Sequence, residues 1–295
     1  MREIFLNWWN HIPEHISPNI VKIGSFQLRY YGLMYLIAFA TVYLLILYRL
    51  NNEKYAYSKK IIQNYFGWAI SGVLIGGRLG YVLFYDFKYF LVHPLRIVCP
   101  FDFSNGFHYV GILGMSYHGG LIGVLVASIL FCYKYRIDFW HFADLFSPAV
   151  PLGYMFGRIG NFINGELYGR VTAVPWGMYF PLDPRHQLRH PTELYEAFFE
   201  GIFLFLILWS IRKRKYFDGF LFSLYLIGYG LVRFFIEFVR QPDPQLGFVL
   251  WSFTMGQILC VLMIFGGILI MLIRRSAHNR GKKSYLKGDG CALKN

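Results

Sequence analysis

Residues 31–48 read YGLMYLIAFATVYLLILY, and this stretch decides the class of fold because it contains no charged side chain. An α-helix crosses the hydrocarbon core of a membrane in about 20 largely apolar residues. The stretch is close to that length, and the first charged residue, Arg49, follows it directly. It therefore predicts a transmembrane helix.

Similar apolar runs recur along the 295-residue chain. We expect an all-α, polytopic membrane protein with about seven transmembrane helices and a small extracytoplasmic arm. The fourth run contains Pro148 and Pro151, which membranes tolerate where neighbouring groups satisfy the freed backbone. The chain is expected to form a single integral membrane domain over 1–295, with an outer arm at about 165–191 and a basic cytoplasmic tail at about 274–295. The expected spans are roughly 31–48, 62–84, 112–133, 142–162, 193–211, 219–239 and 250–273.

The overall composition is that of a membrane protein. Apolar residues make up 56% of the chain and charged residues only 15%, against roughly 45–50% and 25% in soluble domains. These values exclude an ordinary soluble enzyme and a disordered chain. The net charge of +13 would suit a nucleic-acid-binding protein, but the basic residues cluster between apolar runs and no nucleic-acid motif accompanies them. We therefore expect membrane lipids, and no nucleic acid, as partners.

The distribution of lysine and arginine predicts the orientation, because cytoplasmic loops contain an excess of these residues. Loops on one side of the seven expected spans contain 17 basic residues, whereas loops on the other side contain 9. The richer side includes the cluster Arg212–Lys215 and the tail after residue 273. This difference predicts an N-terminus outside the cell and a C-terminus in the cytoplasm.

Three arginines, Arg78, Arg158 and Arg233, remain inside the apolar spans. A charged side chain at the centre of a membrane helix costs about 2.5–3.5 kcal/mol on insertion scales, so it faces the bundle interior or a wet cavity. Arg78 lies beside a row of glycines suited to close helix packing, and its sequence fits a structural and a functional role equally well. The surroundings of Arg158 and Arg233 favour function.

Residues 157–170, GRIGNFINGELYGR, are dense in polar groups where the fourth span ends. Arg158 and Asn161 are three residues apart and share one face if the helix continues. Glu166 adds a carboxylate, and glycines such as Gly169 let the backbone approach a ligand closely. Because a guanidinium group binds phosphate through a planar fork of donors, the segment predicts a phosphodiester site rather than a polar helix end that simply leaves the membrane.

Further candidate residues lie in other spans. Tyr229, Arg233 and Glu237 follow one another at intervals of four residues, so they fall near one face of the sixth helix. Glu237 can form a structural ion pair with Arg233 or orient it toward a ligand, and the two roles are compatible. His118 at the outer start of the third span suits proton transfer, although a hydrogen-bonded structural histidine is the commoner case. Tyr31, at the start of the first span, fits an ordinary aromatic belt.

The cysteines and histidines give no sign of a metal site or a disulfide framework. The four cysteines show no metal-ligand spacing, and His118 has no HxxxH or HExxH partner. We expect no metal and no cofactor.

These motifs resemble the prolipoprotein diacylglyceryl transferase family, the bacterial inner-membrane enzymes that begin lipoprotein maturation. The resemblance runs nearly end to end, from residues 31–35 (YGLMY) to residues 255–259 (MGQIL). Residues 157–170 are similar to the family signature, residues 118–123 (HGGLIG) to its histidine motif, and residues 233–243 to its late arginine segment.

The resemblance implies a multi-pass protein of the inner membrane, with phosphatidylglycerol as donor and the lipobox cysteine of a preprolipoprotein as acceptor. The diacylglyceryl group would move to the thiol as a thioether, and glycerol 1-phosphate would leave. Carried over by position, Arg158 and Arg233 are the essential arginines. The other positions that match functional residues of the family are Tyr31, His118, Asn161, Glu166, Gly169, Tyr229 and Glu237.

For catalysis we expect His118 to act as the general base for the thiol, with Tyr31 as the alternative. Arg158 and Arg233 would stabilise the charge that develops on the leaving phosphate. The expected substrate-binding residues are Arg158, Asn161, Glu166, Gly169, Tyr229 and Glu237.

The competing functional class is an anion or lipid transporter, because intramembrane arginines also serve in transport. Transporters often contain internal repeats with paired broken helices. The chain shows no convincing second copy of residues 157–170, so we favour the transferase.

Overall fold

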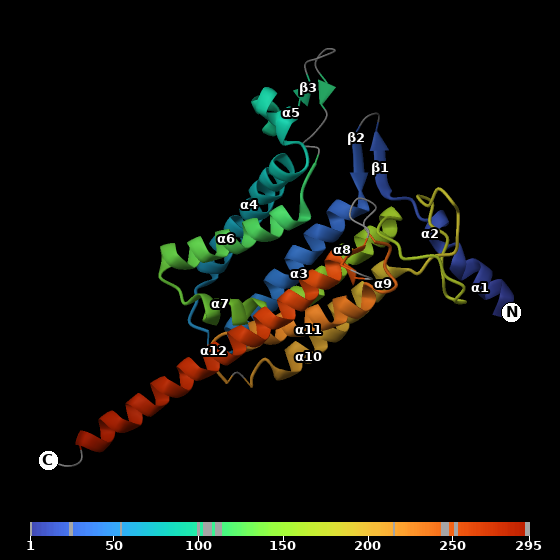
Figure 1. The fold of residues 1–295 in the computed structure, drawn as a ribbon. Coiled ribbons are helices and arrows are strands. Elements are labelled where there is room, and N and C mark those ends of the chain that lie inside the picture. Colours follow the sequence, from blue (N-terminus) through green and yellow to red (C-terminus); the bar gives the residue numbers. More distant parts are fainter. Residues whose placement is uncertain are drawn as a thin grey trace. The chain divides into compact units, whose positions relative to one another are not determined.

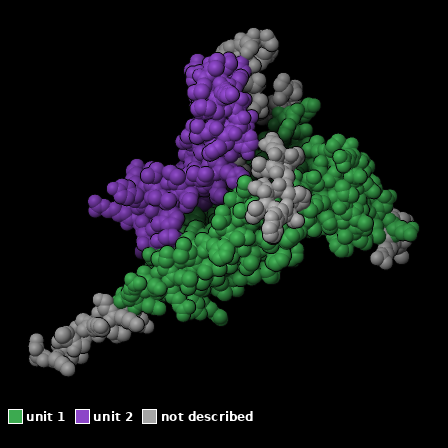
Figure 2. Space-filling view, in the orientation of Figure 1, with its two compact units in different colours: residues 1–54, 143–295 green, residues 55–142 purple. Residues whose placement is uncertain are grey.

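The computed structural model describes residues 2–23, 26–53, 55–98, 101–102, 108–109, 114–214, 216–242, 248–250 and 253–292. The chain divides into two compact units, which Figure 2 shows in green and purple. Unit 1 comprises Met1–Lys54 and Ala143–Asn295, and unit 2 comprises Tyr55–Phe142. The expected basic tail is helical as far as Ala292, and residues 293–295 lie outside the described part.

Unit 1 consists mainly of long helices with two short hairpins (Figure 1). Its elements within the described residues are α1 (Arg2–Asn10), α2 (Ile12–His15), β1 (Asn19–Ile23), β2 (Phe26–Arg29), α3 (Tyr30–Asn52), α8 (Val150–Asn164), α9 (Thr192–Glu196), the π-helix η2 (Ala197–Phe203), α10 (Leu204–Ile211), α11 (Phe220–Ile236), β5 (Phe248–Leu250), β6 (Phe253–Thr254) and α12 (Met255–Ala292). The strands β1 and β2 pair antiparallel, as do β5 and β6.

Unit 2 is built on two long helices. Its described elements are α4 (Lys59–Phe84), α5 (Phe87–Val92), the 3₁₀-helix η1 (Pro94–Ile97), the antiparallel pair β3 (Phe101–Asp102) and β4 (His108–Tyr109), and α6 (Tyr117–Tyr135). The helix α7 (Phe139–Phe146) contains the boundary between the units.

Several helices are suited to a membrane, which confirms the predicted class of a helical, polytopic membrane protein. Large apolar side chains remain exposed on these helices, with Leu36 exposed by 68% and Phe265 by 65%. Such exposure fits helices that hydrocarbon chains surround, because lipid tails are as apolar as leucine. Within the described residues, five helices are long and apolar enough to cross a membrane, namely Tyr30–Asn52, Lys59–Phe84, His118–Tyr135, Thr192–Ile211 and Met255–Gly281, and Phe220–Ile236 is a shorter apolar helix.

The fourth expected span, 142–162, is wrong as a single helix. The helix α7 ends at Phe146, and α8 begins at Val150 after a turn over residues 147–149. Pro148 lies in that turn, and Pro151 lies in the first turn of α8, where its missing N–H removes no helical hydrogen bond. With 15 residues, α8 is shorter than a full crossing.

The fifth expected span contains a wide helical turn. The helix α9 continues through η2 into α10 without a break, so the run extends from Thr192 to Ile211. π-helical turns are rare and occur frequently at functional sites. Here Glu196, the last residue of α9, and Glu200 within η2 are both buried.

The long helices of unit 1 lie alongside one another (Figure 1). The helix α8 packs against α3 and against η2, and α11 packs against α12 and also contacts η2. A polar side chain on the inner face of α8, η2 or α11 can therefore reach partners on the neighbouring helices.

In unit 2, α4 and α6 approach closely along their glycines. A Cβ atom added to Gly72 would lie 2.7 Å from the carbonyl oxygen of Gly123. The guanidinium of Arg78 donates to the carbonyl oxygens of Ile97 at 2.7 Å, Arg96 at 2.6 Å and Gly114 at 3.1 Å. The structural role for Arg78 is thus the one that the contacts favour.

The expected arm, residues 165–191, connects α8 to α9. It folds over a small apolar core of Phe162, Met178 and Phe180. The N-terminal helices pack on it, because Trp9 Nε1 donates to the carbonyl of Trp176 at 3.0 Å. These contacts give the arm a defined shape.

Candidate active site

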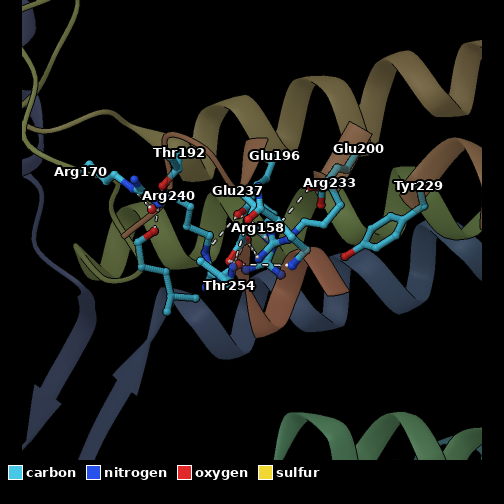
Figure 3. A network of polar contacts seen from close by, with 12 residues as sticks. Arg158, Arg170, Thr192, Glu196, Glu200, Tyr229, Arg233, Glu237, Arg240 and Thr254 are labelled. Carbon is cyan, nitrogen blue, oxygen red and sulfur yellow. Dashed lines mark hydrogen bonds and ion pairs between the residues drawn. The ribbon is translucent and has the colours of Figure 1, made fainter. Parts of the chain in front are cut away.

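Arginines and glutamates from separate elements converge in the interior of unit 1 (Figure 3). The helix α8 contributes one of them, the continuous helix α9–η2 contributes two, and α11 with the residues after it contributes three. We call this set the Arg158 network. Its members within the described part of the chain are Arg158, Glu196, Glu200, Arg233, Glu237 and Arg240.

Glu196 is the centre of the network. Its Oε2 lies 2.9 Å from Nε of Arg158, and its Oε1 lies 2.5 Å from Nη1 of Arg233. Nε of Arg240 lies 3.4 Å from the same Oε1. The glutamate side chain is only 1% exposed. One buried carboxylate therefore holds three guanidinium groups around a common point.

Arg233 has two further carboxylate neighbours. Its Nη2 lies 3.2 Å from Oε2 of Glu237, which confirms the predicted pairing of these two residues. Its Nη1 also lies 3.7 Å from Oε1 of Glu200. Arg240 approaches Glu237 at 3.8 Å. The two arginines thus share Glu237 as well as Glu196.

Two tyrosines lie beside the network. The hydroxyl of Tyr154 donates to Oε2 of Glu200, and the guanidinium of Arg158 lies 4.6 Å from the centre of the Tyr154 ring. The hydroxyl of Tyr229 donates to that of Tyr154 at 3.4 Å. Tyr229 therefore faces the same interior as Arg233, four residues later on α11 (Figure 3).

The end of α8 extends the network toward the arm. Arg158 Nη1 donates to Oδ1 of Asn161 at 3.2 Å, which confirms that the two residues share a helix face. The Nδ2 of Asn161 donates to Glu166 at 2.8 Å, and Asn164 donates to the same oxygen at 3.3 Å. Gly165 ends the helix with a φ of +68°, a conformation that favours glycine. This turn brings Glu166 back onto Asn161.

The start of α12 holds Glu237. The hydroxyl of Thr254 donates to Glu237 Oε1 at 3.1 Å. Thr254 and Gln257 form a reciprocal capping box, with bonds of 3.0 and 3.3 Å between each side chain and the other residue's N–H. A Cβ atom at Gly256 would lie 2.7 Å from the Glu237 carboxylate. The cap therefore sets the position of Glu237.

Gly169 lies where three backbone segments meet. Its N–H donates to the carbonyl of His190 at 2.8 Å, and it forms an antiparallel bridge with Arg240. A Cβ atom at Gly169 would lie 2.6 Å from the carbonyl oxygen of Val239. We call these paired segments, 169–171, 189–190 and 239–240, the backbone ladder, and it fixes Arg240 beside the network.

The two candidate bases lie in different units. Tyr31, in the first turn of α3, packs against Gly160, where an added Cβ would lie 3.2 Å from its ring. Its hydroxyl is 3.0 Å from that of Tyr35. His118 is exposed in the first turn of α6, in unit 2. Tyr31 thus lies next to residues 157–170, the segment similar to the family signature. His118 belongs to unit 2 and is described there by itself.

The charges of the network are arranged so that its cations are the more accessible groups. The side chains of Arg158, Arg233 and Arg240 are 11–18% exposed, whereas those of the three glutamates are at most 5% exposed. An entering anion therefore meets guanidinium donors first. Donors that are already oriented in a water-poor site can stabilise negative charge that develops in a reaction.

Four polar atoms of the network are buried without a hydrogen bond of good geometry among the described residues. The network therefore has bonding capacity that its own members do not use. The four atoms are Glu196 Oε2, Glu200 Oε1, Glu237 Oε2 and Arg240 Nε.

Four functional candidates were missed in the sequence: Tyr154, Glu196, Glu200 and Arg240. A signal existed for the two glutamates, because they lie in the apolar fifth span at a spacing of four residues. An acidic side chain inside a membrane helix is as unusual as an arginine. By the argument applied to the intramembrane arginines, Glu196 and Glu200 are candidate functional residues as well.

Comparison with known proteins agrees along most of the chain. The family model described as "Prolipoprotein diacylglyceryl transferase" matches residues 18–273. A protein of Chlorobaculum tepidum named phosphatidylglycerol–prolipoprotein diacylglyceryl transferase is 57% identical over 91% of this chain and 93% of its own length. Proteins of the same name from Campylobacter curvus and Wolinella succinogenes are 44% and 46% identical, over 96% and 86% of this chain and 100% and 92% of their own lengths.

Proposed function

The chain belongs to the prolipoprotein diacylglyceryl transferase family, and from that premise we propose that the Arg158 network holds the phosphate of phosphatidylglycerol during transfer. The chain is an enzyme that moves the diacylglyceryl group from phosphatidylglycerol to the lipobox cysteine of a preprolipoprotein. The products are a thioether and glycerol 1-phosphate, and this reaction is the first step of bacterial lipoprotein maturation.

The observation that supports the proposed site is the sharing of Glu196 between Arg158 and Arg233. Their ion-pair distances to its two oxygens are 2.9 and 2.5 Å. Each guanidinium group has five N–H donors, and the contacts with the glutamates and Asn161 leave some of these donors for another anion. A phosphodiester is an anion with oxygens that can accept from both.

In the proposed mechanism the cysteine sulfur attacks the glycerol carbon that bears the phosphate. The carbon–sulfur bond forms as the carbon–oxygen bond breaks, and the bonding electrons of the latter pass to the phosphate oxygen. Glycerol 1-phosphate therefore leaves with more negative charge than the diester had. Arg158 and Arg233 stabilise that charge, and one such donor is worth about 3–4 kcal/mol in the transition state.

The thiolate is the nucleophile, so the thiol proton must be removed. We assign this step to His118, with Tyr31 as the alternative base. Asn161 and Glu166 orient Arg158 through their hydrogen-bonded chain. Glu237 orients Arg233 through their ion pair, and Tyr229 lies beside them with its hydrogen bond to Tyr154.

We place the protein in the bacterial inner membrane with its N-terminus outside and its C-terminus in the cytoplasm. The support is the difference of 17 against 9 basic residues between the two sides. On this orientation the arm is extracytoplasmic, where the preprolipoprotein cysteine arrives.

The transporter hypothesis is the weaker one. The relatives are named as transferases, and thioether formation needs no second compartment. Activity in detergent, where no compartments exist, separates the two classes.

The proposed site is tested with purified protein, phosphatidylglycerol and a synthetic lipobox peptide. Mass spectrometry should show a diacylglyceryl gain on the cysteine. Arg233→Ala should lower the rate by about 10²–10³, since removing one charge-stabilising donor has that effect. His118→Ala should lose less, because water or Tyr31 can accept the proton.

Equal rates for Arg233→Ala and the unchanged protein would contradict the assigned site. No mass gain with folded protein and intact lipid would contradict the transferase activity itself.

A further inference from the structure

The arm forms a pocket whose lining includes no member of the Arg158 network. Its volume is about 360 Å³, near the lower end for sites that bind small molecules. Three segments of unit 1 line it: the end of the signature, the middle of the arm, and the residue after Arg240. We call it the arm pocket, and its polar lining residues are Tyr168, Asp183, Arg185, Arg189 and Gln241.

A locked ion pair forms one side of the arm pocket. Arg189 donates from Nε and Nη2 to the two oxygens of Asp183, each at 2.8 Å. The bonds from Arg189 are the main reason that the pKa of Asp183 lies below its usual value. Arg189 also donates to Gln241 at 3.2 Å and lies 5.2 Å from the Tyr168 ring centre. These charges cancel, and their positions are fixed.

Arg185 is different, because its charge is not cancelled. Its side chain is exposed, and no carboxylate of the described residues lies within ion-pair distance of it. The polar contact that places it is made by its backbone, whose N–H donates to Asp183 Oδ1 at 3.3 Å. The arm pocket thus has one net positive charge at its rim.

The backbone ladder connects the arm pocket to the Arg158 network. Tyr168 precedes Gly169, which pairs with Arg240. Gln241 follows Arg240, whose side chain approaches Glu196 at 3.4 Å. A chain that leaves the network along this ladder therefore reaches the arm pocket within a few residues.

We propose that the arm pocket binds the stretch of the acceptor polypeptide just after the modified cysteine, and that Arg185 favours an acidic side chain there. The inference rests on the proposed function. When the cysteine lies at the arginines, the apolar residues before it stay in the membrane, and the residues after it must pass over the arm. A pocket of this size takes one or two side chains of such an extended segment.

The test uses three peptides with the same lipobox. One ends directly after the cysteine as an amide, one continues with an acidic extension, and one continues with the same extension carrying lysines. We expect kcat/KM to be up to about fivefold higher for the acidic than for the lysine peptide, as for an exposed ion pair. Arg185→Ala should remove the difference, Arg185→Glu should reverse it, and neither should affect the short peptide.

Lys22→Glu is the matched control, because it makes the same change of charge at an exposed position of β1. It should leave the ranking of the peptides unchanged. An unchanged ranking in Arg185→Glu, or an equal loss for the short peptide, would overturn the proposal. A raised KM for phosphatidylglycerol alone would also overturn it and would assign the pocket to a lipid head group. Failure of all three peptides with the unchanged, folded protein would instead refute the proposed function.

Discussion

Two buried groups of arginines and acids in the described part of unit 1 use the same chemistry in opposite ways. The first, which we call the Arg49 cluster, consists of Arg49, Glu53, Asp144 and Arg212. Arg49 is fully buried and donates twice to one oxygen of Glu53, at 2.9 and 2.7 Å, and also to the carbonyls of Asp144 and Leu145. Arg212 donates to the other Glu53 oxygen at 2.9 Å.

Asp144 completes the Arg49 cluster. Its two oxygens accept from the backbone N–H groups of Gly219 and Phe222 at the start of α11, each at 2.9 Å. No acid oxygen of the Arg49 cluster is buried without a partner in the described structure. The cluster ties α3, α7, α10 and α11 together and offers little to a ligand.

The Arg158 network has similar side chains but is not saturated. Four of its atoms lack a good hydrogen bond, and its arginines stay partly exposed. The difference between the two groups separates charge that stabilises the fold from charge that is available to a substrate. Burial alone does not distinguish them.

The sharpest test of this comparison is Arg49→Ala. It leaves one oxygen of the Glu53 carboxylate and two buried carbonyls without the donor that Arg49 supplies, which costs about 3–5 kcal/mol of folding free energy. Thermal unfolding in detergent should show a large fall in melting temperature. Activity per folded molecule should persist, in contrast to Arg233→Ala.

The matched control is Arg275→Ala, at an exposed position of α12. If Arg49→Ala and Arg275→Ala have the same melting temperature, the Arg49 cluster does not stabilise the fold, and the comparison with the Arg158 network fails.

Glu196→Gln tests the Arg158 network, the second group in the comparison. The amide keeps the shape but removes the charge that positions both arginines, and a misplacement of about 1 Å can cost a hundredfold in rate. We expect kcat to fall by about that factor, without a rise in the KM for phosphatidylglycerol, because the network becomes more positive. Steady-state kinetics at varied lipid concentration separate the two constants.

Glu14→Gln serves as the control, since Glu14 forms an exposed pair with His186 that is worth at most about 1 kcal/mol. A rise in KM with kcat intact in Glu196→Gln would mean that the glutamate does not act through the arginines.

Asp183→Asn extends the comparison to the arm. The pKa of Asp183 is lowered in the fold, so its stabilisation is complete above its unfolded value near 3.9 and is lost as pH falls through the folded value. At neutral pH the variant should lose about 1.5–3 kcal/mol, as for a hydrogen bond to a charged group. The difference in melting temperature between the two proteins should shrink as pH falls below about 4.

A difference in melting temperature that stays constant down to pH 3 would show that the Asp183 charge does not stabilise the arm.

Thr254→Val is the mildest change. It removes the bond to Glu237 and one bond of the capping box, together about 1 kcal/mol, or roughly fivefold in kcat. Thr254→Ser keeps both bonds and should behave like the unchanged protein. Equal rates for the valine and serine variants would exclude Thr254 as a positioning residue.

The sequence predicted those parts of the site that depend on local helical spacing. The contact between Arg158 and Asn161 and the pair of Arg233 and Glu237 follow from intervals of three and four residues. Glu196 joins helices that lie far apart in the sequence, and no periodicity states which helix faces which. The sequence therefore showed an acid in the fifth apolar span, but not that this acid is the centre of the network.

The fold shows the same limit. Hydropathy locates apolar helices well, because each satisfies its own backbone. In the sequence, Pro148 and Pro151 were the sole sign of the break between α7 and α8. The apolar pattern of the fifth span did not indicate the π-helix η2. Arg78 donates to three backbone carbonyls, and the pattern of side chains in a sequence does not reveal partners of this kind.

Gly169 has a consequence for genetic experiments. Even the methyl group of alanine would collide there with the carbonyl of Val239 and the side chains of His190 and Thr192, and so would displace Arg240. A screen for loss of transferase activity would rank Gly169 beside Arg233, although the side chain of Gly169 is only a hydrogen atom. Positions that do not tolerate mutation in this protein will therefore include sites of close backbone contact, such as Gly169, as well as side chains that bind the lipid.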